Sequence, residues 1–304
     1  MFADIVDISL VSSVLRALTP VLLAALGGAL CAKAGVFNVG LEGFMLVGAF
    51  AAVAGSWFGG SPWIGVLAAV LAGAAMAAVL SVASIRLGGG EIIIGIALNL
   101  LAVGLTAFLL RTTFGVQGTF TDPGLQGLPT VGGQTPLTYL AWVLVPILSL
   151  FLRRHIWGFR LQGVGEAPEA AHSLGVNPAT YRHAAVLASG VLCGLAGAQL
   201  ALGNVILFSE NMTAGRGWVA VVAVMLGQAA PFGVLLASVL FATTEAIGFR
   251  LQGLGLPSQV ASAAPYAITL LALIAASLRG RSLLSTRRPR PPGDRASQHH
   301  QENV

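Results

Sequence analysis

Two clusters of polar residues stand among glycines in an otherwise apolar chain, one in each half of the sequence. The stretch GVFNVGLEGFMLVGAF holds Asn38 and Glu42, and the stretch NVILFSENMTAGRGW, residues 204–218, holds Glu210 and Arg216. A buried charge costs about 2.5–3.5 kcal/mol on insertion scales, so it is rarely kept in a membrane without a partner or water. Polar, glycine-broken segments in both halves of a chain are typical of a central translocation path.

The first cluster has two interpretations. Its glycines would allow a helix to break and expose backbone groups to a cavity. Alternatively, a helix begins at the membrane interface, with Asn38 as its N-cap and Glu42 in its first turn. A third candidate is Asn99, in the middle of EIIIGIALNLLAVG, which either lines the same path or makes an interhelical hydrogen bond. The residue types leave both choices open.

Spacings typical of enzymes are weak or absent. Glu169 and His172 have Glu-x-x-His spacing, but a di-iron bundle needs two such motifs and further Glu ligands. No G-x-S-x-G elbow occurs. The only lysine, Lys33, lies between two alanines, so the G-K-[ST] of a phosphate-binding loop cannot form. We therefore expect no catalytic residue, metal or cofactor in this chain, and ATP, if it drives the protein, must bind to another subunit.

The composition indicates an integral membrane protein. Of 304 residues, 56% are hydrophobic and 9% are charged, and the mean hydropathy is +0.86; soluble domains carry about 25% charged residues. Charge-free intervals such as 43–85 and 217–244 reach the roughly 17–25 residues that a transmembrane helix needs. The net charge of +5 comes mostly from arginines beside these intervals, which favours cytoplasmic anchoring over binding to nucleic acid.

These intervals predict an all-α, polytopic transmembrane helix bundle of about eight or nine spans. The expected domain is residues 1–284, followed by a disordered, basic cytoplasmic tail at 285–304. Helices are expected at residues 9–30, 41–58, 62–85, 91–111, 137–152, 183–208, 217–229, 232–250 and 262–279. The segment 217–229 is short enough to be a half-helix.

Arginines set the expected orientation. Arg153, Arg154 and Arg160 place the loop 153–182 in the cytoplasm. Tracing the spans backward places the Gly- and Pro-rich segment 112–136 outside, and the N-terminus also outside if every span is complete.

The loop 153–182 is expected to contain one short helix, PEAAHSLG. Pro168 suits the first turn of a helix and Gly175 suits its end. Ala170 and Ala171 would offer a flat surface that another protein could approach closely.

The same residues carry a resemblance to a known family. EAPEAAHSLG resembles the EAA signature of ABC-importer permeases, here Glu169, Ala170, Ala171 and Gly175, with Glu166 just before them. AGVFNVGLEGFMLVGAF and FSENMTAGRGWVAVVAVMLGQAAPFG are similar to segments of the branched-chain amino acid and simple-sugar permease group. EIIIGIALNLLAVG and MTAGRGW resemble its nucleoside-type subfamily. The resemblance covers about residues 15–274.

The resemblance implies a permease subunit of an importer in the bacterial plasma membrane. It implies a separate ABC ATPase that binds ATP and Mg²⁺, a second and longer permease, and an extracytoplasmic substrate-binding lipoprotein. The implied cargo is a nucleoside, otherwise a simple sugar. Together with the polar clusters, it predicts a path shaped by Asn38, Glu42, Asn99, Glu210 and Arg216. The alternative is an ion-coupled secondary transporter that uses Glu42 or Glu210, which would not need an EAA-type helix.

Overall fold

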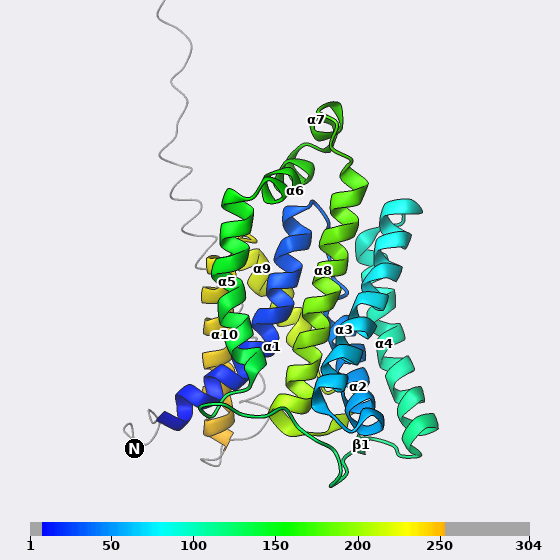
Figure 1. The fold of residues 1–304 in the computed structure, drawn as a ribbon, viewed down its shortest axis with the longest axis vertical. Coiled ribbons are helices and arrows are strands. Elements are labelled where there is room, and N and C mark those ends of the chain that lie inside the picture. Colours follow the sequence, from blue (N-terminus) through cyan, green and yellow to red (C-terminus); the bar gives the residue numbers. More distant parts are fainter. Residues whose placement is uncertain (1–7, 253–304) are drawn as a thin grey trace, which may run out of the picture.

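The computed structural model describes residues 8–252 and shows a bundle of long helices (Figure 1). Seven of the helices described are long and apolar enough to span a membrane. They are α1 (Ile8–Lys33), α2 (Leu41–Gly59), α3 (Pro62–Ser81), α4 (Glu91–Phe114), α5 (Pro136–Arg154), α8 (Pro178–Ala198) and α10 (Pro231–Gln252). The chain is therefore a mostly helical, multi-pass membrane protein. The helix expected at 262–279 and the tail expected at 285–304 lie outside the described residues.

Shorter elements join or extend these helices. Two π-helical turns, η1 (Val82–Arg86) and η2 (Gln199–Val205), continue α3 and α8. The half-helix expected at 217–229 is present as α9 (Arg216–Leu226). Strands β1 (Thr119–Phe120) and β2 (Phe208–Ser209) form one antiparallel pair.

The loop 153–182 is more helical than expected. Besides α7 (Pro168–Ser173), it contains α6 (Ile156–Glu166), which the sequence analysis missed. The glycines within IWGFRLQGVGE hide its helical character. The side chain of His155 caps its start by accepting a hydrogen bond from Trp157 N at 3.2 Å.

Helix α8 begins five residues before the expected position at 183. The predicted start was wrong because it left Asn177 and Pro178 in the loop 153–182. Instead, Asn177 Oδ1 accepts a hydrogen bond from Ala179 N at 3.0 Å, and Pro178 occupies the first turn. Both are favoured at a helix start.

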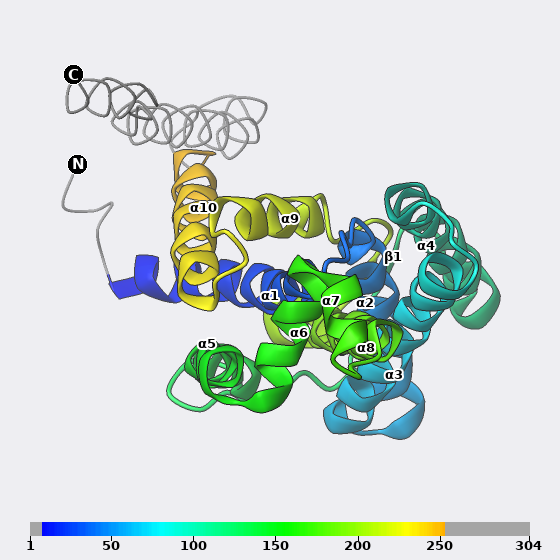
Figure 2. The same ribbon diagram turned by 90° about the horizontal axis from the view of Figure 1, so that it is seen from above.

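Helices α1 and α8 form the interior of the bundle (Figure 2). In each of them 78% of the most apolar window is buried, against 33% in α3 and α5 and 28% in α4. The outer helices keep apolar side chains on their free faces, as surfaces in contact with lipid do.

Close approach between the inner helices depends on glycine. A Cβ on Gly48 of α2 would lie 2.8 Å from the Cα of Gly194 of α8. The Gly190/Gly194 spacing thus marks close helix packing, as small residues four apart do in membranes.

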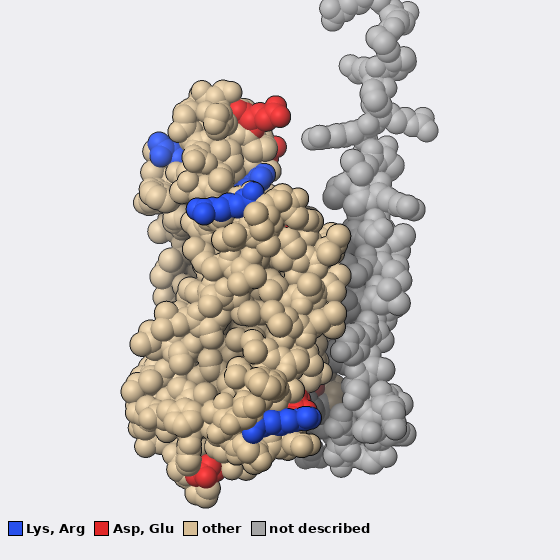
Figure 3. All heavy atoms as spheres, turned by 90° about the vertical axis from the view of Figure 1, so that its right-hand side faces the viewer, with Lys and Arg blue, Asp and Glu red and all other residues tan. Residues whose placement is uncertain are grey.

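Charged side chains gather at the two ends of the bundle, with an uncharged belt between them on the face drawn in Figure 3. Helices α6 and α7 lie at one end, while β1 and the start of α1 lie at the other (Figure 1). The α7 end carries the basic residues Lys33, Arg86, Arg153, Arg154, Arg160 and Arg182. The positive-inside rule assigns such an end to the cytoplasm.

Candidate functional site

Helix α2 begins inside the bundle. A Cβ on Gly28 of α1 would lie 3.0 Å from the Leu41 side chain, so α2 starts beside Gly28 and not beside Lys33, where α1 ends. The chain therefore returns into the bundle in a non-helical conformation before α2 forms. This geometry favours the broken-helix interpretation over a helix start at the interface, because irregular backbone at membrane depth is tolerated where protein surrounds it.

One face of α4 receives this returning segment. Phe37 N donates a hydrogen bond to Glu91 Oε2 at 2.6 Å, and Gly43 N donates to Asn99 Oδ1 at 2.8 Å. Between these two contacts, a Cβ on Gly95 would lie 3.1 Å from the backbone N of Gly40. Glu91, Gly95 and Asn99 are spaced i, i+4 and i+8, so they lie on one face of the helix.

The two predicted amides satisfy backbone groups at the break. Asn99 also donates from Nδ2 to Val39 O at 3.0 Å. Asn38 accepts from Gly40 N at 2.9 Å and donates to Ser189 Oγ on α8 at 3.1 Å. Both amides are buried, at 8% and 5% exposure. Since unpaired backbone groups are costly in a membrane, these side chains stabilise the broken segment.

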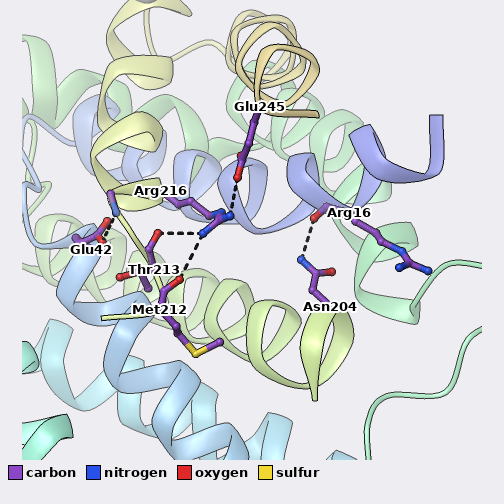
Figure 4. A network of polar contacts seen from close by, with 8 residues as sticks. Arg16, Glu42, Asn204, Met212, Thr213, Arg216 and Glu245 are labelled. Atoms are coloured by element: carbon purple, nitrogen blue, oxygen red, sulfur yellow. Dashed lines mark hydrogen bonds and ion pairs between the residues drawn. The ribbon is translucent and has the colours of Figure 1, made fainter. Parts of the chain in front are cut away.

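Glu42 joins the start of α2 to the start of α9. Its Oε1 accepts a hydrogen bond from Gly215 N at 2.9 Å, and its Oε2 accepts from Gly217 N at 2.6 Å (Figure 4). Helix N-termini carry unpaired N–H groups and a partial positive charge, both of which favour a carboxylate. Glu42 therefore acts as the N-terminal cap of a helix that starts 174 residues later.

Arg216, the first residue of α9, also holds the start of this helix in place. Its Nη2 donates to Glu245 Oε1 on α10 at 2.5 Å, and its Nη1 lies 3.4 Å from the carbonyl oxygens of Met212 and Thr213 (Figure 4). A cavity of about 330 Å³ opens beside this pair. It is lined by Ser13, Arg16, Ala17, Asn204, Arg216, Glu245 and Ala246.

Residues in the left-handed backbone conformation (positive φ) flank α9 on both sides. All the non-glycine residues with positive φ in the described part of the chain lie within 206–229. Before α9 they are Ile206, Asn211 and Ala214, and after it they are Gln228 and Ala229. Such conformations cost on the order of 1–3 kcal/mol each unless the surroundings enforce them, and they cluster at functional sites. Helix α9 is therefore held in place by its neighbours.

Four of the five predicted path residues surround the starts of α2 and α9: Asn38, Glu42, Asn99 and Arg216. Glu210 lies apart from them, beside the strand pair. Its Oε1 accepts from Gly118 N at 3.1 Å, and its own N donates to Gly118 O at 2.8 Å. The path role of each residue stays a prediction.

Helix α7 forms where the EAA-like motif predicted it. Gly175 has φ +79°, its N donates to His172 O at 2.9 Å, and Val176 N donates to Ala171 O at 3.0 Å. These two bonds make a Schellman C-cap, which favours glycine at that position.

The surface of α7 differs in one respect from the expectation. Ala170 is exposed, as are Glu166 and Glu169, but Ala171 is only 9% exposed and packs against its own chain. Leu174 is 84% exposed at the tip. The exposed surface of α7 therefore offers Ala170 and the projecting Leu174, and not the expected pair of alanines.

Sequence reasoning missed Glu91, Gly95, Asn204 and Glu245. Glu245 was visible in principle, since it is an acid that directly follows the charge-free interval 217–244 and lies within α10. An ionisable residue inside a span is a functional candidate with a partner to be found. The partner, Arg216, becomes evident only from the fold.

Comparisons with known proteins identify the family. The model of the family described as "Branched-chain amino acid transport system / permease component" matches residues 10–276. The nucleoside ABC transporter permease protein NupC of Lactococcus lactis subsp. cremoris is 34% identical, over 87% of this chain and 90% of its own. TsgC13 of Haloferax volcanii, provisionally named as a glucose ABC transporter permease, is 36% identical over 81% and 79%.

The fold has a solved relative as well. An ABC transporter described as of the metal-chelate type, in an inward-facing conformation, superposes with a TM-score of 0.52 at 21% identity. The match covers 91% of this chain and 87% of the other. With nearly the whole chain matched by the family model, the chain belongs to the branched-chain amino acid transport permease family and is a permease subunit of an ABC transporter.

Proposed function

We propose that this chain forms part of the path by which an importer carries a nucleoside across the bacterial plasma membrane. The observation that carries the proposal is the 34% identity to a nucleoside permease over nine-tenths of that protein's length. The nucleoside-type motifs EIIIGIALNLLAVG and MTAGRGW support it. They contain Asn99 of α4, which accepts a hydrogen bond from the first turn of α2, and Arg216, the first residue of α9.

The proposed complex has four kinds of component. This permease pairs with a second, longer permease, an ATPase on the cytoplasmic side binds ATP and Mg²⁺, and a lipoprotein delivers the cargo from outside. Helix α7 is the proposed docking element for the ATPase. It projects beyond the bundle at the basic end (Figure 1), and Ala170 and Leu174 are exposed on it.

The proposed path passes the starts of α2 and α9. Two helices that begin inside the bundle can shift at their ends without breaking a continuous backbone ladder. Asn38, Glu42 and Asn99 would keep the broken backbone satisfied, and Arg216 faces the cavity beside them. Glu210 is proposed to act nearer the outer end, where it joins β2 to the loop after α4.

A simple sugar is the second candidate cargo, since the glucose-type relative is 36% identical. An ion-coupled carrier has no support from the family. The deciding experiment reconstitutes the permease with its genomic neighbours in proteoliposomes and measures ATP-dependent uptake of guanosine, uridine and glucose. Uptake of nucleosides, with little uptake of glucose, is expected. Uptake of glucose alone would reassign the cargo, and uptake of none of the three would overturn the proposal.

A further inference from the structure

The cavity of about 330 Å³ beside Arg216 is bounded by four elements. Ser13, Arg16 and Ala17 come from α1, Asn204 from η2, Arg216 from α9, and Glu245 and Ala246 from α10. Its volume lies at the lower end of the roughly 300–1,000 Å³ typical of small-molecule sites. The cavity has a polar wall formed by Arg16, Asn204, Arg216 and Glu245.

The charged pair in this wall is unusual for a membrane span. Arg216 and Glu245 are 20% and 19% exposed, and Glu245 lies within a helix long enough to cross the membrane. Ionisable residues in such helices are rare, and they mark substrate paths when they face a cavity. The third charged residue of the lining, Arg16, points its guanidinium away from the pair (Figure 4).

The pair keeps hydrogen-bonding capacity for a ligand. Glu245 uses Oε1 for Arg216, and among the residues described its Oε2 has no partner. Arg216 has five N–H donors, yet within residues 8–252 it reaches, besides Glu245, only two carbonyl oxygens, each at 3.4 Å. The pair thus presents a carboxylate acceptor and guanidinium donors side by side, and its two charges balance each other.

Asn204 fixes the opposite wall. Its Nδ2 donates to Arg16 O at 3.1 Å, and its Oδ1 accepts from Gln199 Nε2 at 3.1 Å. The amide oxygen has a second lone pair, so it can also accept from a ligand.

From this arrangement we infer that the cavity binds the vicinal hydroxyl groups of a sugar ring, with Glu245 as the acceptor and Arg216 as the donor. A hydroxyl both donates and accepts, so two neighbouring hydroxyls match a carboxylate beside a guanidinium. The balanced charges of Arg216 and Glu245 suit a neutral group such as a hydroxyl. The inference rests on the proposed function and deepens it, since both the ribose of a nucleoside and a free sugar carry this diol.

The test compares uptake of guanosine, 2′-deoxyguanosine, 2′,3′-dideoxyguanosine and glucose by the reconstituted complex, for the wild type and for Glu245→Gln. The wild type should favour guanosine over the dideoxy analogue by about tenfold in kcat/KM, the factor that loss of a charged hydrogen bond gives. Glu245→Gln should reduce that ratio to about threefold or less, mainly through KM, because the acceptor loses its charge.

Matched variants separate binding from folding. The control variant Thr243→Val is on the same helix. In the described part of the chain, the Thr243 hydroxyl donates only to Val239 O of that helix, at 2.7 Å, so the variant should leave the ratio unchanged. If Glu245→Gln does not assemble, Ala17→Leu places a larger apolar side chain at a position that lines the cavity, and it should raise KM for guanosine.

The outcomes are distinct. The inference is overturned if the wild type takes up guanosine and 2′,3′-dideoxyguanosine with equal kcat/KM, or if Glu245→Gln leaves the ratio of the two kcat/KM values unchanged. The nucleoside cargo stands in both cases. The same holds if Ala17→Leu leaves KM unchanged. Glucose uptake that depends on Glu245 keeps the diol site and changes the cargo. Uptake of neither guanosine nor glucose overturns both.

Discussion

Glu42 on α2 and Gly217 on α9 are in direct contact, and the carboxylate of Glu42 accepts a hydrogen bond from Gly217 N at 2.6 Å. A Cβ on Gly217 would lie 2.7 Å from that oxygen and 2.5 Å from Glu42 N. Only glycine therefore fits at the second position of α9. The two residues lock together two helix starts that the sequence separates widely.

Replacing Gly217 with alanine should force α9 away from α2. The added methyl group has backbone atoms for neighbours, which cannot move aside as a flexible side chain can. Glu42→Gln should have a related but smaller effect, since it removes the charge from two backbone hydrogen bonds, a loss of about 1–3 kcal/mol. The unfolding temperature of the purified permease and the rate of ATP-dependent uptake by the complex should both fall in each variant. Both decreases should be larger for Gly217→Ala than for Glu42→Gln.

A matched glycine controls for the substitution itself. Outside the backbone of its own helix turns, no atom of residues 8–252 lies within 4 Å of where a Cβ on Gly104 of α4 would be, so Gly104→Ala should be neutral or slightly stabilising. If Gly217→Ala and Gly104→Ala had the same unfolding temperature and the same uptake rate, the contact with Glu42 would have no mechanical role.

Asn99 should matter through both halves of its amide. Asn99→Ala leaves Gly43 N and Val39 O without their side-chain partner, and each unsatisfied buried group costs about 1–3 kcal/mol. Uptake should fall while the complex still assembles. Asn99→Asp keeps an acceptor for Gly43 N and should retain more activity than Asn99→Ala.

Thr106→Val on the same helix is the control for Asn99. Thr106 is buried, but its hydroxyl bonds within its own helix, to Ala102 O at 2.8 Å. Normal uptake in Asn99→Ala would remove Asn99 both from the path and from the support of the break.

Sequence reasoning found the elements better than their contacts. The charge-free intervals predicted the long helices, and the brevity of 217–229 predicted the half-helix α9. The tie between Glu42 and Gly217 could not be predicted, because neither residue type specifies a partner so far along the chain. Helix α6 was missed because its glycines weaken the local helical pattern, and the inward orientation of Ala171 depends on how α7 packs.

Transport should require ATP hydrolysed by a separate subunit. The family is that of ABC transporter permeases, and the only lysine, Lys33, cannot complete a phosphate-binding loop. Proteoliposomes that contain this chain alone should take up no nucleoside under a proton or sodium gradient. Gradient-driven uptake by this chain alone would contradict the importer proposal.

Leu174 should contribute to ATPase docking and little to folding. It is 84% exposed at the tip of α7, so Leu174→Ser removes almost no packing from the permease itself. An apolar side chain buried at an interface is worth about 1.5–3 kcal/mol. ATPase binding and stimulated ATPase activity should therefore fall while the unfolding temperature of the permease stays unchanged. Ser173→Ala, beside it on the same helix, should change neither quantity.

Gly175 should matter both for the shape of α7 and for the space around it. It ends the helix at φ +79°, and nothing lies within 4 Å of where its Cβ would be. A methyl group there would meet no steric clash among residues 8–252, so its cost is the left-handed backbone, about 1–2 kcal/mol. Gly175→Arg should therefore fold in the membrane, because this cost is confined to a short surface helix.

The defect of Gly175→Arg should instead appear in the coupling of ATP hydrolysis to transport. If the ATPase docks closely on α7, the arginine side chain would occupy the space that Gly175 leaves open, and both stimulated ATPase activity and uptake should fall several-fold with the partner permease still bound. Gly175→Asn is the matched variant, because asparagine tolerates the left-handed conformation and is smaller; it should retain most of the activity. Equal losses in the two variants would assign the effect to the backbone, whereas normal uptake in Gly175→Arg would show that α7 only connects α6 to α8.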